Sequence, residues 1–70
     1  MMIEAKTLMF PNLVAEMARN GESSQMVAQL LKLSAPSFTR RMRGEIEWSK
    51  PEIDTLCEHY QKPYEYLFGK

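Results

Sequence analysis

Apolar side chains recur along this chain at helical spacing, in short blocks that turn-forming residues separate. Residues 23–44 contain two such blocks and are the most informative part of the sequence. The first block places three apolar side chains on one helical face, namely Val27, Ala28 and Leu31. The second block places Phe38 and Met42 on one face at i, i+4. This spacing predicts two short helices joined by a tight turn, in which Leu33 fills the corner and Ser34 caps the second helix.

The second of these helices, residues 34–43, is basic on the face opposite its apolar pair. Pro36, Arg40 and Arg43 project from that face, and residues 32–43 contain four cations and no acid. The net charge of the chain is zero, which argues against a polyanionic partner, but the distribution of charge matters more than its sum. A cluster of arginines on a lone helix is usually a solvated surface. Beside a second short helix, it is typical of proteins that insert a helix into the major groove of DNA.

Residues that favour helix starts and helix ends mark the bounds of the first three predicted helices. A first helix is predicted to begin at Pro11 and to end at the cap formed by Asn20-Gly21. Its expected apolar stripe consists of Leu13, Val14, Met17 and Ala18. Ser23 suits the N-cap of the second helix, and Gly44 is expected to end the third.

A fourth helix is predicted to begin at the capping box SKPE, residues 49–52. Its apolar stripe consists of Ile53, Leu56, Cys57 and Tyr60. Pro63 stops this helix, and residues 64–68 are expected to form one last helical turn or two. Trp48, in the preceding loop, is expected to lie in the core with Phe38. The whole pattern predicts a compact all-α domain of five short helices.

Length and composition narrow the class of protein. The chain has 70 residues, 44% of them hydrophobic, which suits a single domain with its own core. We expect residues 1–9 to form an N-terminal arm, flexible or added as a strand, and residues 10–70 to form the helix-turn-helix domain. No apolar run reaches the roughly 20 residues of a membrane span, and the first residues lack the pattern of a signal peptide. We therefore expect a cytoplasmic protein without a membrane partner.

The inventory of reactive side chains favours a binding protein over an enzyme. With one cysteine, Cys57, and one histidine, His59, the sequence offers neither an internal disulfide nor the ligands of a structural zinc site. Cys57 is expected to be an inert buried thiol, and His59 to be exposed without a catalytic partner. No nucleophile–base pair or glycine-rich phosphate loop is present. We expect no enzymatic activity, no cofactor, no metal and no small-molecule ligand.

Residues 11–69 resemble the helix-turn-helix domains of the phage Cro and CI repressor type, also called the XRE family. The similar segments are PNLVAEMARNG as first helix, SSQMVAQLLKL and SAPSFTRRMRG as paired helices, and EIEWSKPEIDTLCEHYQKPYEYLFG as loop and last helices. Ala28 lies where the family has a small residue between the paired helices, and Gly44 where its recognition helix ends. Two positions depart from the family: Lys32 replaces the usual turn glycine, and Ser24 replaces the usual glutamine at the start of the second helix.

The resemblance implies which residues face DNA. Those expected to approach base edges are Ala35, Pro36, Ser37 and Arg40. Those expected to approach phosphates or to flank the site are Ser23, Ser24, Gln25, Thr39, Arg41 and Arg43. Arg40 is the strongest candidate for reading a base, because a guanidinium matches O6 and N7 of guanine. Arg41 points sideways and can serve either a DNA strand or an intramolecular carboxylate; Lys6 in the arm is a weaker candidate.

The resulting expectation is a sequence-specific DNA-binding transcriptional regulator, of the kind found as phage or prophage Cro- or CI-like repressors. Its partner would be a double-stranded DNA operator, bound as a homodimer on palindromic half-sites. Residues 64–68, with three aromatic side chains and a leucine, are a candidate dimer contact. The alternative, above all for Leu67 and Phe68, is that they pack onto the fourth helix of the same chain. Two alternatives stay open: a protein-interaction module, such as an inhibitor or adaptor, that reuses this fold, and an antitoxin that represses its own operon.

Overall fold

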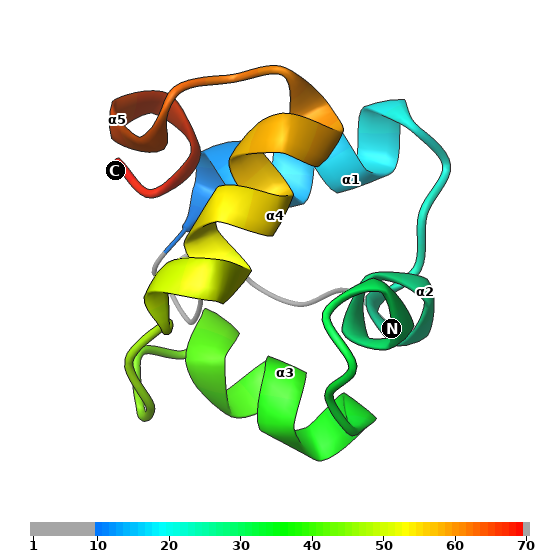
Figure 1. Cartoon of the computed structure of the whole chain (residues 1–70). Helices are drawn as coiled ribbons and strands as arrows, with labels where there is room; N and C mark the ends of the chain where they lie inside the picture. Colours follow the sequence, from blue (N-terminus) through cyan, green and yellow to red (C-terminus); the bar gives the residue numbers. More distant parts are fainter. Residues whose placement is uncertain (1–9, 70) are drawn as a thin grey trace.

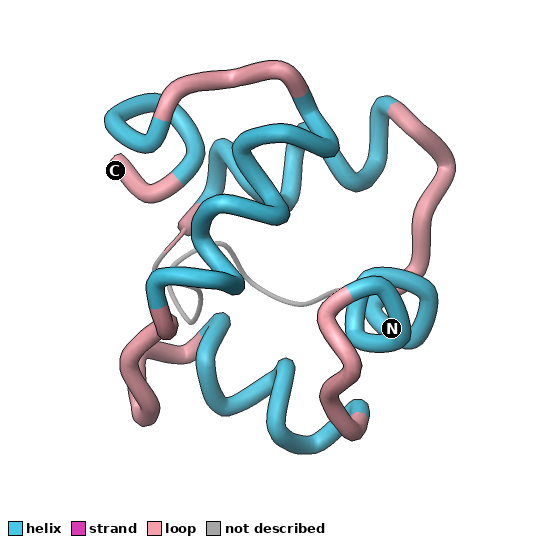
Figure 2. Tube along the Cα trace, in the orientation of Figure 1, coloured by secondary structure: helices cyan, strands magenta, loops and turns pink. Residues whose placement is uncertain are grey.

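A computed structural model describes residues 10–69 of the chain, which contain five helices and no strand (Figures 1 and 2). The helices are α1 Pro11–Arg19, α2 Ser24–Leu30, α3 Ala35–Met42, α4 Lys50–Tyr60 and α5 Tyr64–Leu67. The predicted all-α five-helix architecture is thus confirmed. The expected arm, residues 1–9, and Lys6 within it lie outside the described residues.

Serine side chains begin α2, α3 and α4, as their positions in the sequence predict. Ser23 Oγ accepts a hydrogen bond from the backbone N–H three residues later at 3.2 Å, and Ser34 Oγ does the same at 3.3 Å. Ser49 and Glu52 form the predicted capping box. In it, the Ser49 N–H donates to Glu52 Oε1 at 3.0 Å and the Glu52 N–H donates to Ser49 Oγ at 3.4 Å. These local bonds satisfy donors that a helix start leaves free.

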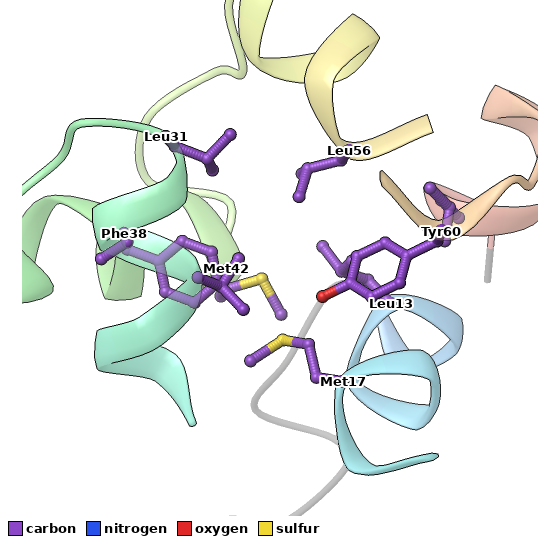
Figure 3. Packing of buried hydrophobic residues seen from close by; sticks show 10 residues of the cluster. Leu13, Met17, Leu31, Phe38, Met42, Leu56 and Tyr60 are labelled. Atoms are coloured by element: carbon purple, nitrogen blue, oxygen red, sulfur yellow. The ribbon is translucent and has the colours of Figure 1, made fainter. Parts of the chain in front are cut away.

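The helices enclose one apolar core (Figure 3). Its buried hydrophobic side chains are Leu13, Met17, Val27, Ala28, Leu31, Phe38, Met42, Leu56, Tyr60 and Leu67. Figure 3 shows side chains of α1, of the α2–α3 pair and of α4 converging on one centre. Each fully buried Leu or Phe contributes about 1.5–3 kcal/mol by removing apolar surface from water. The α2–α3 pair is therefore held in place by the same core that closes the domain.

The loop before α4 adds an aromatic cluster at one end of this core. The Trp48 ring packs edge-on against Phe10, Phe38 and Phe68, with ring centroids 6.0, 5.9 and 5.4 Å away. The expected core position of Trp48 and Phe38 is confirmed, since Phe38 belongs to the buried cluster and the half-buried Trp48 packs against it. Within residues 10–69, no helix has the length and apolar character needed to cross a bilayer.

The buried face of α1 differs from the predicted stripe. Ala18 is exposed, whereas Glu16 is buried at 3% exposure. The Glu16 carboxylate is tolerated there because it accepts hydrogen bonds from the Tyr66 hydroxyl at 2.9 Å and from Arg19 at 2.6 Å. The prediction for Ala18 was wrong because periodicity counts apolar residues only, and it misses a charged residue that is buried with one partner on its own helix and one on α5.

Candidate nucleic-acid interface

Helix α3 lies at the edge of the molecule (Figure 1), and it has one buried face and one exposed face. Phe38 and Met42, with 1% and 4% of their surface exposed, anchor the inner face. On the outer side, the exposed residues are Ala35, Pro36, Arg40 and Arg43. Ser37 and Thr39 are half-buried at the borders of that face. The structure therefore gathers the residues expected to approach DNA from this helix on one accessible surface, apart from Arg41.

The corner between α2 and α3 is a tight turn. Ala28 is 2% exposed, and its carbonyl accepts a hydrogen bond from the Leu33 N–H at 2.8 Å, which closes the corner. Lys32 adopts a φ of 60°, in the left-handed region where glycine is usually preferred. The turn therefore keeps its shape although Lys32 replaces the family's glycine, at the cost of backbone strain at Lys32.

The start of α2 presents a second polar surface. Ser23, Ser24 and Gln25 are all exposed. Because Ser23 Oγ acts as the acceptor in its cap, its hydroxyl hydrogen stays available for an outside acceptor. A helix start of this kind offers N–H groups and a partial positive charge to a phosphate.

Glu22, the residue before the Ser23 cap, contacts two side chains of α4, and the sequence analysis did not predict these contacts. Glu22 accepts from the Tyr60 hydroxyl at 2.6 Å and lies 2.6 Å from Nε2 of His59. Burial raises the pKa of the Glu22 carboxyl, but the hydrogen bonds from Tyr60 and His59 and the positive charge of His59 outweigh it, so the pKa is lowered from its ordinary 4.5. His59 is exposed, as expected, but it is not isolated, because the Glu22 carboxylate is its partner.

The three arginines of the basic cluster lie in different surroundings. Arg40 is exposed, and Arg43 is exposed with its Nη1 3.9 Å from a carboxylate oxygen of Glu45. At that distance and exposure the ion pair contributes little, so the Arg43 guanidinium stays accessible. Arg41 is different: its Nε donates to Glu52 Oε1 at 2.9 Å, and its Nη1 donates to the Ser37 carbonyl at 3.2 Å. This geometry corresponds to the intramolecular carboxylate, one of the two alternatives open for Arg41.

In residues 10–69, the remaining reactive side chains form no further site. Among the described residues, no three metal-ligating side chains gather in one place. Cys57 is half-buried, and burial together with the nearby carboxylates of Asp54 and Glu65 raises the pKa of its thiol. A raised pKa lowers the fraction of reactive thiolate at neutral pH.

Two short capped helices joined by a tight turn, with the second presenting an exposed basic face, define this protein as a helix-turn-helix domain. The chain belongs to the BetR domain family, which it matches over residues 5–70. This is a helix-turn-helix DNA-binding domain family related to the XRE type and typically non-enzymatic. Membership suggests a DNA-binding transcriptional regulator. A comparison with curated proteins gives no match.

Proposed function

We propose that this protein is a sequence-specific transcriptional regulator, a Cro- or CI-like repressor of phage or prophage type, that inserts α3 into the major groove of its operator. The observation that carries the proposal is the outer face of α3. Arg40 and Arg43 are exposed there, while Phe38 and Met42 hold the opposite face in the core. A short helix anchored by its inner face and charged on its outer face suits the width of the major groove.

The residues of this face have different roles in the proposed complex. Arg40 donates two hydrogen bonds to a guanine, and Ala35 and Pro36 contact a thymine methyl group. The Ser37 hydroxyl can donate a hydrogen bond to a base or accept one from it. Arg43 contacts a phosphate one turn further along, with Thr39 at the flank. The exposed start of α2 binds another phosphate through Ser23, Ser24 and Gln25. With few hydrogen-bonding groups at the bases, DNA shape contributes to sequence preference.

A titration of duplex DNA at two salt concentrations tests the proposal. We expect the wild-type chain to bind, with an affinity that falls as salt rises because phosphate contacts release counterions. Replacing Arg43 by Ala should weaken binding to all sequences and reduce the salt slope by about one. The matched control is Lys62→Ala, since Lys62 is an exposed cation between α4 and α5 and not on α3. If the wild type and Arg43→Ala have the same salt slope, Arg43 does not contact DNA. If the wild type does not bind duplex DNA at all, the proposal is refuted.

The proposed complex contains two copies of the chain. One α3 offers few base contacts, and a pair of recognition helices about 34 Å apart doubles them on a palindromic operator. The supporting surface lies beside α5, where Tyr64 is 54% exposed and Ile46 37% exposed at a groove of about 430 Å³. Sedimentation of the protein with and without DNA tests this part. A monomer that binds a single half-site as tightly as a full palindrome would contradict it.

A protein-interaction module is a second candidate, supported by one observation. Met26 and Leu30 lie one turn apart on α2 and are 54% and 40% exposed, more than a purely DNA-binding helix requires. The DNA titration separates the two candidates, because a module of this kind has no salt-dependent affinity for duplex DNA.

A further inference from the structure

Arg41 belongs to the basic cluster of α3 by sequence but not by position. Only 15% of its side chain is exposed, whereas 56% of the Arg43 side chain is. Its guanidinium is held at two points, by Glu52 Oε1 on Nε and by the carbonyl of Ser37 on Nη1. A guanidinium bound on two sides and largely shielded from solvent has few donors left for a phosphate.

The carboxylate that holds Arg41 also starts α4. Glu52 Oε1 accepts the Ser49 N–H at 3.0 Å and the Arg41 Nε–H at 2.9 Å. Only 12% of the Glu52 side chain is exposed, so water screens the pair less than it screens the surface ion pairs. One carboxylate oxygen thus joins the second half of α3 to the first turn of α4, across the loop that separates them in sequence.

We propose that Arg41 is a positioning residue: through Glu52 it fixes the rotation and tilt of α3 on the domain, and thereby the direction in which Arg40 and Arg43 face DNA. The apolar anchors Phe38 and Met42 lie along one line of the helix, and a helix held along one line can still roll about it. Arg41 supplies a contact to the side of that line. Neighbouring residues are about 100° apart around a helix, so Arg40, two residues after Phe38, lies on the far side of α3 from that anchor. A small roll of α3 therefore displaces Arg40 from a base edge. This inference rests on the proposed function and assigns one arginine of the cluster a role other than DNA contact.

Neutralising Glu52 distinguishes this role from direct phosphate contact. If Arg41 contacts phosphate, Glu52→Gln frees its guanidinium and removes a nearby negative charge, so DNA affinity rises. If Arg41 positions α3, Glu52→Gln loosens the helix and affinity falls, although the chain has become more positive. A glutamine at residue 52 still suits the capping box, so α4 keeps its start. Glu58→Gln is the matched control, since it removes an exposed carboxylate of the same helix.

The experiment measures affinity and salt slope on a duplex selected from a random-sequence library and on a scrambled duplex of the same length. The variants are Arg41→Gln, Glu52→Gln and the double variant, each corrected for its folded fraction by circular dichroism. We expect each single variant to lose about tenfold on the selected duplex and less on the scrambled one, with the salt slope unchanged. The double variant should bind no worse than either single variant, because the two residues act through one contact.

Three other outcomes overturn the proposal. A salt slope reduced by about one in Arg41→Gln would make Arg41 a phosphate contact. Unchanged affinity per folded molecule would make the Arg41–Glu52 pair a matter of stability alone. If wild-type protein binds no duplex, the proposed function fails first and this inference fails with it. Should Arg41→Gln not fold, Arg41→Lys and Glu52→Gln carry the test, since lysine keeps the charge but cannot make both bonds of the guanidinium.

Discussion

At the scale of single residues, the corner between α2 and α3 is the most strained point of the paired helices. Lys32 has a φ of 60°, and the exposed loop after α4 contains a second left-handed residue, Gln61, with a φ of 56°. The family resemblance draws attention to Lys32 because it replaces a glycine. Nothing in the sequence marks Gln61, since a left-handed residue without glycine has no local signature.

Lys32→Gly should raise the free energy of unfolding by about 1 kcal/mol, because glycine adopts a positive φ without the clash of a Cβ. Chemical denaturation measures the change. Lys32→Ala is the control: it removes the charge and the long side chain but keeps the Cβ, so it should gain nothing. Equal stabilisation by both variants would assign the effect to the side chain and contradict the backbone explanation.

At the scale of helices, what could be predicted depends on the distance between interacting residues. The caps at Ser23, Ser34 and Ser49 act within three residues of sequence, and the sequence predicts each of them. The links from Glu16 to Tyr66 and from Glu22 to His59 join residues 50 and 37 positions apart. Such pairs depend on how the helices pack, so a pattern along one helix cannot reveal them. The same holds for the bond between Arg41 and Glu52, where the sequence left two alternatives.

Phe38 fixes α3 to the rest of the core, which gives a test of the helix phase. Phe38→Ala should cost about 3–5 kcal/mol, comparable to the whole stability of a domain of this size. Thermal melting measures the loss. Leu30→Ala is the matched control, because Leu30 is 40% exposed and its truncation should cost within about 0.5 kcal/mol. If Phe38→Ala leaves the melting temperature almost unchanged, the Phe38 side chain does not lie in the core and α3 is rotated relative to it.

The link between the start of α2 and the end of α4 should depend on pH. The pKa of Glu22 is lower in the folded protein than its ordinary 4.5, so its carboxylate stabilises the fold above that pH. This contribution is lost as pH falls through the lowered pKa. Glu22→Gln should therefore be less stable than wild type at neutral pH, and the difference should shrink in acid.

Denaturant unfolding of both proteins across a pH series measures that difference. Glu58→Gln, which removes an exposed carboxylate of α4, serves as the reference for a change of charge alone. A difference between wild type and Glu22→Gln that stays constant into acid would mean that the carboxylate has the same pKa in the folded and unfolded chains.

At the scale of the whole molecule, a net charge of zero hides an uneven distribution. Arg40 and Arg43 are exposed on α3, while exposed acids on α4 and α5 include Asp54, Glu58 and Glu65. Helix α5 lies on the opposite side of the molecule from α3 (Figure 1). If α3 contacts DNA as proposed, its exposed arginines attract the polyanion while Glu65 on α5 lies away from it, so the local distribution of charge matters more than its sum.

Selection of bound duplexes from a random-sequence library tests whether the protein reads a DNA sequence, since it measures binding and identifies the operator in one experiment. We expect one enriched sequence with two inverted half-sites about one helical turn apart. Arg40→Ala should lose the preference for guanine at one position in each half-site, at a cost of roughly 1–3 kcal/mol on the best sequence. A recovered pool as random as the input would contradict sequence-specific binding by this protein.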